Sequence, residues 1–508
     1  MVSKIRTVAF LGLRPIEIMV EAQSSPGMSS FSIVGLPDKA VGEAKERIRA
    51  AFFQLGIGMP VKKIVINMAP ADLPKAGSHY DLPIALAIMG AIEVIDISVL
   101  ENFIVIGELG LDGSLPYISG TLCASMLANE NNFSILCPKT CEKEAIWSGN
   151  NSIIAAPNLG SILNHISGRT QIASSEFESH NFSKSKEFGI DMSDVYGQNL
   201  AKRALEVAVS GAHNVLMIGA PGSGKSMLAE RLQTILPNLE AREALETTCV
   251  YSISGKVPDD GLIYSPPYRA PHNSASLMSI VGGGTDAKPG EISLAHNGIL
   301  FLDELPEFQK ATIDSLRQPL ETNDITISRA KEHITYPANI QLVAAMNPCK
   351  CGYFGNTHKQ CSKAPKCAVD YRNRISGPIL DRFDIIVYVN DIKISEFFKN
   401  TKGETSKIIR ERVRIVRDIQ KSRVEEEGKQ GSYLNAKMHS NKLEKILFMD
   451  EETKIFFQTA IERLDLSARG YHKILRVART IADMERSKSV KREHIAEAMQ
   501  YRLLKIID

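Results

Sequence analysis

The pattern of apolar and polar positions divides the chain into parts with different periods. Residues 1–168 mix strand patterns, in which apolar and polar residues alternate, with helical patterns such as 40–55. A polar, serine-rich stretch without periodicity follows at 169–189, as is typical of a linker. Residues 190–392 again combine strands and helices, whereas residues 393–508 are charge-rich and helical in pattern. We therefore predict two α/β domains joined by a linker and followed by a helical domain.

A pair of short alternating stretches lies inside the second α/β domain. The segments DITIS and EHITY flank a basic turn that contains Arg329 and Lys331. Alternation on both sides of a short polar turn predicts a β-hairpin. Such a hairpin presents two cations at its tip, although a solvated charged turn would have the same pattern.

Composition narrows the class of protein without indicating a function. The 508 residues are 44% hydrophobic, which suffices for several cores, and the formal net charge of +2 means that any nucleic-acid surface must be local. The longest apolar run, 82–92, is too short to cross a bilayer, and the short apolar stretch near residue 10 lacks a small-residue cleavage site after it. A soluble, cytoplasmic protein without membrane contact is predicted. Its eight cysteines do not resemble the disulfide framework of a small secreted protein.

The strongest local motif is a glycine-rich loop between a strand and a helix. An apolar strand at 215–218 runs into GAPGSGKS, which matches G-x-x-x-x-G-K-[ST], and a helical pattern follows; a chance glycine-rich turn would lack this context. The backbone N–H groups of such a loop and the helix N-terminus bind phosphates, so the motif predicts ATP and Mg²⁺ as cofactors. Lys225 would reach the β- and γ-phosphates, and Ser226 would bind the Mg²⁺. The predicted nucleotide-binding residues of the loop are Gly219, Ala220, Pro221, Gly222, Ser223, Gly224, Lys225 and Ser226.

An acidic pair ends a second buried strand of the same domain. Four apolar residues at 299–302 are followed by Asp303 and Glu304. Downstream of a phosphate-binding loop, this pattern predicts that Asp303 holds the Mg²⁺ shell and that Glu304 polarises the attacking water. An acidic pair that merely caps the strand is the alternative.

Two more polar residues are candidates for catalysis. Asn347 ends the apolar strand IQLVAAM and would orient the water or sense the γ-phosphate, although a turn-capping Asn would look the same. Arg382 lies between Asp381 and Asp384 in LDRFD. An arginine placed at the γ-phosphate of a neighbouring subunit stabilises transition-state charge, whereas an ion pair with the flanking aspartates is the alternative.

Four cysteines fall within a loop at 349–367. Their spacing is C-x-C-x₉-C-x₅-C, and the residues between them include too few apolar side chains to order the loop by themselves. Four soft ligands suit a structural Zn²⁺ that pins the loop and takes no part in catalysis, while unligated thiols in a reducing cytoplasm are the alternative. His358 would be a substitute for one cysteine. The predicted ligands are Cys349, Cys351, Cys361 and Cys367.

Together these motifs resemble the AAA+ ATPases, in particular the branch with magnesium chelatase ATPase subunits and MCM helicases. As in that branch, a long segment at 237–298 precedes the acidic strand, and the hairpin precedes the Asn347 strand. The segments YRAPHNSASLMSIVGGG, KPGEISLAHNGILFLDELPEF and RISGPILDRFDI are similar to the YifB/ComM family, and the resemblance covers nearly the whole chain. It implies a homohexameric motor on single-stranded or branched DNA that promotes branch migration of recombination intermediates in natural transformation.

The resemblance also implies a place for the DNA. In a ring the hairpin tip faces the pore, where Arg329 and Lys331 would grip phosphates without reading the base sequence. The glycine-rich segment near 275–290 would supply a second pore loop.

The N-terminal part resembles the proteolytic domain of Lon proteases. The segment PKAGSHYDLPIALA is similar to the nucleophile segment of Lon, and GELGLDGSLPYISG is similar to its lysine segment. Where Lon has its serine this chain has His79, preceded by Ser78, and where Lon has its lysine it has Leu122. A Ser–Lys dyad requires an amine beside the hydroxyl, so we predict a protease-like fold without peptidase activity.

The C-terminal part resembles an AAA+ lid. Its segment 466–486 is similar to the lid helix that carries a second sensor arginine; Arg469 matches best and Arg476 is the alternative, and either arginine could simply be solvated on an amphipathic helix. The predicted fold is α/β throughout the first two domains: a Lon-protease-like domain at 1–168, a linker at 169–189, an AAA+ core with a pre-sensor hairpin at 190–392 and a helical lid at 393–508.

Three functions remain open from the sequence. A DNA motor accounts for the basic hairpin, and we favour it. The ATPase subunit of a magnesium chelatase would not need the Lon-like domain, although the ATPase core alone does not exclude it. An ATP-dependent protease would need the dyad that the chain lacks.

Overall fold

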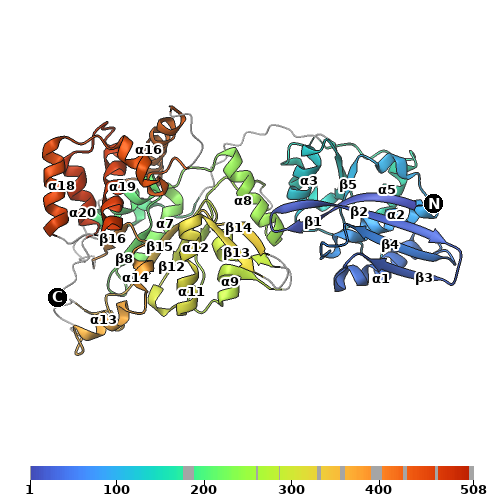
Figure 1. Cartoon of the computed structure of the whole chain (residues 1–508), viewed down its shortest axis with the longest axis horizontal. Helices are drawn as coiled ribbons and strands as arrows, with labels where there is room; N and C mark the ends of the chain where they lie inside the picture. Colours follow the sequence, from blue (N-terminus) through green and yellow to red (C-terminus); the bar gives the residue numbers. More distant parts are fainter. Residues whose placement is uncertain are drawn as a thin grey trace.

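The computed structural model places three domains along the length of the molecule (Figure 1). It describes residues 2–150, 152–175, 188–258, 261–284, 287–328, 333–354, 361–390, 403–426, 432–463 and 467–502. Within these residues, every helix is too short or too polar to cross a membrane.

A seven-stranded mixed sheet forms the centre of the N-terminal domain, with the strand order β3-β4-β2-β1-β5-β6-β7. β1 and β2 make a long antiparallel hairpin in which Leu11 pairs with Arg14. β4 is antiparallel to β2, whereas β3 is parallel to β4 and β5, β6 and β7 continue the sheet in parallel. The strands are β1 (Val2–Leu11), β2 (Arg14–Ser25), β3 (Ser30–Val34), β4 (Lys63–Ala69), β5 (Phe103–Val105), β6 (Ser134–Pro138) and β7 (Ile153–Ala156).

Helices cover this sheet with their apolar faces inward. In the helix predicted at 40–55, Val41, Ile48 and Phe52 are buried, which confirms the expected spacing. The helix that follows β4 is buried along its whole length and packs against β1 and β2. The helices are α1 (Lys39–Gln54), α2 (Asp81–Ala91), α3 (Thr121–Glu130), α4 (Glu142–Ile146) and α5 (Leu159–Ile166).

The N-terminal domain extends beyond its predicted end at residue 168. Ser175 forms a β-bridge with Ile153, and Ile172 packs against the core of this domain. One apolar residue and one edge bridge are too short a signal for periodicity to detect. The remainder of the predicted linker, from 176 to 187, lies outside the described residues.

The second domain has a five-stranded parallel sheet with the order β16-β8-β15-β12-β9. Apart from β9 and the last residue of β16, its strand residues are buried, as expected for a parallel sheet covered by helices on both faces. The strands are β8 (Val215–Ile218), β9 (Tyr268–Arg269), β12 (Ile299–Leu302), β15 (Gln341–Met346) and β16 (Ile385–Tyr388). The helices are α6 (Asn199–Gly211), α7 (Lys225–Ile235), α8 (Ala241–Ser254), α9 (Leu277–Val281), α10 (Glu291–Leu294), α11 (Lys310–Ser315), α12 (Arg317–Thr322), α13 (Lys366–Arg372) and α14 (Gly377–Leu380).

Two small hairpins accompany this sheet. The predicted hairpin is present: β13 (Asp324–Ser328) and β14 (His333–Pro337) pair from Asp324↔Pro337 to Ser328↔His333. Its tip, with Arg329 and Lys331, lies outside the described residues. In the glycine-rich segment near 275–290, β10 (Gly282–Gly283) pairs with β11 (Lys288–Pro289).

The C-terminal domain is helical, as predicted, and packs on α6 and α7 of the core. Its central helix buries Leu475, Ala478 and Ala482, the three positions expected to face inward. The helices are α16 (Ser406–Glu426), α17 (Ser440–Ile446), α18 (Glu451–Arg463), α19 (Ala468–Met484) and α20 (Arg492–Gln500).

The two α/β domains contact each other directly. The β1–β2 turn lies against the hairpin, since a Cβ on Gly12, whose φ is +66°, would stand 3.0 Å from Cγ2 of Ile334. A second contact joins α4 to α8, where Ser252 donates its hydroxyl to the buried carboxylate of Glu144. The N-terminal domain therefore rests on the same hairpin that leads into the ATPase sheet.

Candidate functional site

The phosphate-binding loop connects the carboxyl end of β8 to α7, in the predicted strand–loop–helix arrangement. Gly222 and Gly224 have φ of +82° and +92°, a region that residues with a Cβ rarely adopt. Gly219 has no room for a side chain, because a Cβ there would clash with the carbonyl oxygen of Val389 and lie 2.7 Å from Oγ of Ser223. The loop thus curls tightly around the first turn of α7.

The side chain of Lys225 points back to the start of the phosphate-binding loop. Its Nζ donates to the carbonyl oxygens of Gly219 and Ala220 at 2.8 Å each and to Oδ1 of Asn347 at 3.2 Å. The strand pairing explains this meeting: Met346 of β15 is opposite Ile218 of β8, so the residues that follow both strands are adjacent. The structure therefore brings Asn347 to the phosphate-binding loop.

The acidic pair also lies at the carboxyl end of the parallel strands. Oγ of Ser226 donates to Oδ2 of Asp303 at 2.6 Å, which places one hydroxyl and one carboxylate oxygen side by side. Hard oxygen ligands of this kind are typical of Mg²⁺ sites. Glu304 adopts a left-handed backbone with φ of +51°, and its N–H donates to Oδ1 of Asp303 at 2.9 Å.

These residues fit a nucleotide with its Mg²⁺. Oγ of Ser223 is buried and lacks a hydrogen-bond partner among the described residues, which is costly unless a ligand supplies one. Lys225 provides a cation, the glycines provide a curled backbone, and Ser226 with Asp303 provides metal ligands. When bound, ATP would supply the γ-phosphoryl group that is hydrolysed.

No role was predicted from the sequence for two further residues of this site. The side-chain amide of Asn273, in the segment after β9, donates to Oε2 of Glu304 at 3.1 Å. The side chain of Gln198 donates to the carbonyl oxygens of Ser223 at 3.3 Å and Asn390 at 2.6 Å, and so joins the phosphate-binding loop to the end of the core. The only available signal for Asn273 was its place in the segment YRAPHNSASLMSIVGGG, four residues after the end of β9, and that signal gives no role.

Arg382 lies at the opposite end of the parallel strands, where they begin. Its carbonyl oxygen accepts from the side chain of Asn214, the residue before β8, at 3.1 Å, so it is separated from the phosphate-binding loop by the length of that strand. Its guanidinium pairs with Glu321 rather than with the flanking aspartates, and the side chain is 15% exposed. Burial and the nearby charges of Arg469 and Arg317 lower the pKa of Arg382.

The lid arginines also lie near that edge. Arg469, at the start of α19, is exposed and stands 3.6 Å from Asp381. Burial lowers the pKa of Arg476, while the charge of the buried Asp384, the residue before β16, acts to raise it. Although burial alone would raise it, Lys473 and His213 hold the pKa of Asp384 below its usual range. Among the described residues, the carboxylates nearest to the two lid arginines are therefore Asp381 and Asp384, at the amino end of the sheet, and not groups of the phosphate-binding loop.

The four cysteines come together after Asn347. The Sγ atoms of Cys349, Cys361 and Cys367 all lie within 4.8 Å of one another. Cys351 completes the group, because its Sγ is 3.2 Å from that of Cys349, while the Sγ atoms of Cys361 and Cys367 are 3.1 Å apart. Three convergent thiols, with the fourth beside Cys349, suit a Zn²⁺ site of four soft ligands. His358, the proposed substitute ligand, lies outside the described residues.

The Lon-like segment has no Ser–amine pair among its described contacts. The hydroxyl of Ser78 donates to Glu108, and the Nζ of the buried Lys75 donates to the carbonyl oxygen of Pro70. His79 is buried with Nε2 2.9 Å from the carbonyl oxygen of Val8, and burial lowers its pKa to about 4. Leu122 is buried in the contact with α8.

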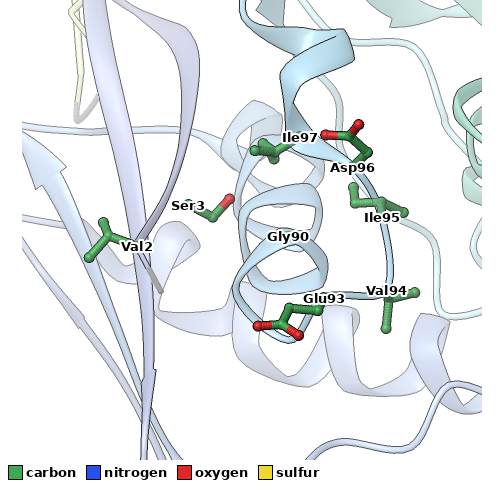
Figure 2. Close-up of a pocket in the computed structure, with 8 residues that line it drawn as sticks. All are labelled: Val2, Ser3, Gly90, Glu93, Val94, Ile95, Asp96 and Ile97. Atoms are coloured by element: carbon green, nitrogen blue, oxygen red, sulfur yellow. The ribbon is translucent and has the colours of Figure 1, made fainter.

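A separate cavity of about 320 Å³ lies in the N-terminal domain, between the start of β1 and the end of α2 (Figure 2). Its lining combines aliphatic side chains with the carboxylates of Glu93 and Asp96 and contains no basic residue. A cavity of this charge does not suit a phosphate ligand. The phosphate-binding loop at the carboxyl end of the second sheet remains the better candidate for a nucleotide.

The fold and the site define a magnesium-chelatase-like AAA+ ATPase. Residues 191–397 match the family model described as magnesium chelatase, subunit ChlI. Residues 20–141 match subunit ChlI of Mg-chelatase, and residues 403–502 match the C-terminal model of the same subunit.

Full-length relatives narrow the class to one family. The chain is 41% identical over 500 residues to competence protein ComM of Haemophilus influenzae, which covers 98% of this chain and 96% of that protein. It is 39% identical over 503 residues to protein YifB of Escherichia coli, with 99% and 97% covered. The chain therefore belongs to the YifB/ComM family. A weaker similarity, 26% identity over 203 residues, links it to the DNA replication licensing factor mcm6 of Dictyostelium discoideum and covers 39% of this chain and 19% of that protein.

Proposed function

We propose that this protein is an ATP-hydrolysing ring motor that translocates on DNA and promotes branch migration of recombination intermediates in natural transformation. One observation carries the proposal. The hairpin strand β14 ends at Pro337, β15 begins at Gln341, and β15 ends beside the phosphate-binding loop, where Asn347 meets Lys225. A movement of the hairpin is thereby linked by one short, buried strand to a residue that contacts the nucleotide site.

Each residue of the site has a role in this proposal. Lys225 binds the phosphates, Ser226 and Asp303 hold the Mg²⁺, and Glu304 takes a proton from the attacking water. Asn347 orients that water. These roles use oxygen and nitrogen atoms that already converge at one edge of the sheet.

The position of Arg382 supports action between subunits. Arg382 and Arg469 lie near the amino end of the sheet, where Arg382 meets Asn214, whereas Lys225 meets Gly219 at the carboxyl end; the strand between Asn214 and Gly219 spans about 17 Å at ~3.3 Å per residue. In a homohexameric ring, Arg382 of one subunit would stand at the nucleotide of the next. Arg382 would have to leave Glu321 to do so.

DNA would be held at the ring's centre by the tip of the hairpin. Arg329 and Lys331 at that tip are the proposed contacts with DNA phosphates. The names of two relatives, a competence protein and a replication licensing factor, support DNA as the partner. Such a motor would work in the cytoplasm on single-stranded or branched DNA.

The alternatives receive less support. The family models are named after a chelatase ATPase subunit, which speaks for that alternative. However, the similarity to a magnesium-chelatase 67 kDa subunit of Chlorobaculum parvum is 26% identity over 161 residues, so it supports a shared ATPase core and no more. A peptidase is disfavoured because Ser78 bonds to a carboxylate, which cannot act on it as the amine of a Ser–Lys dyad does.

Zinc is the proposed structural metal of the cysteine cluster. Cys349, Cys351, Cys361 and Cys367 would bind one Zn²⁺ per chain. The metal would order the loop after Asn347 and would not take part in hydrolysis.

The decisive experiment compares ATP hydrolysis by the purified protein alone, with single-stranded DNA and with a four-way branched DNA. A DNA motor is expected to hydrolyse ATP several-fold faster with DNA and to move the branch point in an ATP-dependent manner. The Glu304→Gln variant serves as the control for contaminating ATPases. A chelatase subunit would be indifferent to both DNAs, and that result would overturn the proposal.

A further inference from the structure

The cysteine cluster lies directly against the phosphate-binding loop. Gly352, the residue after Cys351, has φ of +83°, and a Cβ there would stand 2.5 Å from Cγ of Pro221. Pro221 is the third residue of the loop GAPGSGKS. The backbone of the cysteine segment therefore touches the loop so closely that no side chain fits between them.

The turn that makes this contact is tied to the cluster. The N–H of Gly352 donates to the carbonyl oxygen of Cys349 at 2.9 Å. Cys349 is fully buried and is the residue whose Sγ meets those of Cys361 and Cys367. Holding the four sulfurs together thus fixes the position of Gly352 over Pro221.

The same segment is connected to the phosphate-binding loop at its other end. The N–H of Gly219 donates to the carbonyl oxygen of Met346 at 3.2 Å, and Lys225 donates to Asn347. The loop GAPGSGKS is therefore contacted by the β15–cysteine segment at its beginning, at Pro221 and at Lys225. One continuous stretch, 346–352, spans these three contacts.

We propose that the metal-bound cysteine cluster holds the phosphate-binding loop in the form that accepts a nucleotide, so that zinc and nucleotide each strengthen the binding of the other. The inference rests on the proposed ATP and zinc sites and adds their coupling. Without the metal, the segment has too few apolar side chains to order itself, and Pro221 loses the surface on which it rests. If zinc strengthens the binding of the nucleotide, the nucleotide must strengthen the binding of zinc by the same factor.

The direct test measures the rate at which zinc leaves the protein. Zinc-loaded protein is treated with excess of a chromogenic chelator, with and without ADP and Mg²⁺, and the absorbance of the chelate is followed. We expect release to slow by about fivefold or more when the nucleotide is bound, a coupling of the size that links other pairs of sites. Equal rates with saturating ADP would overturn the inference.

Variants separate the contact from the metal. Gly352→Ala should keep one zinc per chain but bind ADP several-fold more weakly, because its Cβ displaces Pro221. ADP should then no longer slow the release of zinc from this variant. Gly56→Ala is the matched control, since Gly56 also has a positive φ, +70°, but a Cβ there meets open space; it should behave as the unchanged protein. Pro221→Ala offers a second route to the same loss without any change in the cysteine segment.

The outcomes distinguish the proposals from one another. Lys225→Ala should keep its zinc, and ADP should not slow zinc release from it, simply because this variant does not bind nucleotide. Protein that binds ADP but contains no zinc would overturn this inference and the zinc site, and would leave the ATPase proposal standing. Protein that binds zinc and ADP, with zinc release and ADP affinity both unaffected by Gly352→Ala and Pro221→Ala, would refute the coupling alone.

Discussion

The side-chain amide of Asn273 donates to Oε2 of Glu304 at 3.1 Å, so the proposed catalytic base is held by a residue from the segment after β9. That segment continues into α9 and the β10–β11 hairpin, which includes the proposed second pore loop. A hydrogen bond to one carboxylate oxygen restrains the orientation of the side chain and stabilises its charged form, which makes it a weaker base. The bond thus connects a proposed DNA-binding segment with the chemistry of hydrolysis.

Asn273→Ala is expected to raise ATP hydrolysis in the absence of DNA by about threefold or more, because one hydrogen bond of ~1 kcal/mol no longer restrains Glu304. The stimulation by DNA should shrink correspondingly. Steady-state kcat with and without single-stranded DNA measures both effects. Ser274→Ala is the control, since Ser274 bonds to His272 rather than to Glu304. A drop in basal kcat would mean that Asn273 positions Glu304 for the water instead.

Glu304→Gln should bind ATP and assemble but hydrolyse it about 10²–10⁴-fold more slowly, because an amide cannot take the proton of the water. Lys225→Ala should fail at the earlier step, since it removes the cation that faces the phosphates. Binding of a fluorescent ATP analogue and single-turnover hydrolysis separate the two defects. Normal turnover by Glu304→Gln would refute the assignment of the base.

Arg382→Ala should abolish most hydrolysis without weakening nucleotide binding by the same chain, because the arginine is proposed to act on a neighbour. An arginine in this role contributes about 10³–10⁵ to kcat in other phosphoryl-transfer enzymes. Mixing Arg382→Ala with Lys225→Ala protein should restore part of the activity, since some interfaces regain a complete site. Glu321→Gln is the companion variant: it frees Arg382 and should keep activity or raise it. No rescue at any ratio, with assembly intact, would indicate that the Glu321 ion pair is the whole role of Arg382.

The double change Arg329→Ala and Lys331→Ala should spare basal hydrolysis and reduce both DNA stimulation and branch migration. Loss of two phosphate contacts should lower the salt slope of single-strand binding by about 0.7 per cation. Fluorescence anisotropy over a range of salt concentrations measures this slope. Replacing Lys288, a cation at the β10–β11 hairpin, tests whether the effect is particular to the tip. Unchanged translocation by the double variant would exclude the hairpin tip as the DNA grip.

His79 should make the N-terminal domain less stable in acid. Its pKa is about 4 in the fold and 6.5 when unperturbed, because burial disfavours the charged imidazole. The unfolded chain therefore takes up the proton first, and stability falls as the pH drops from 6.5 towards 4, by up to about 3 kcal/mol. Urea unfolding at pH 7.5 and pH 5 measures the loss, and His79→Gln, which keeps an N–H donor near Val8, should show less of it. An equal pH dependence in the two proteins would assign the acid sensitivity to other groups.

The sequence by itself determined the features that depend on contiguous residues. The loop at 219–226, the acidic pair at 303–304 and the hairpin at 324–337 are each recognisable because strand periodicity, glycine chemistry and turn composition act over a few neighbouring positions. The buried strands at 215–218 and 299–302 are recognisable because they are apolar throughout. These local rules hold whatever the rest of the chain does.

Only the tertiary structure decided which distant residues meet. Nothing in the spacing of Asn273 and Glu304, of Gly352 and Pro221, or of Arg382 and Glu321 indicates that they touch; strand order and loop packing bring them together. Ser175 joined the first sheet through a single bridge that has no period to detect. The reason is physical: a local pattern records the preference of a few adjacent residues, whereas a contact between distant residues depends on the free energy of packing the whole domain.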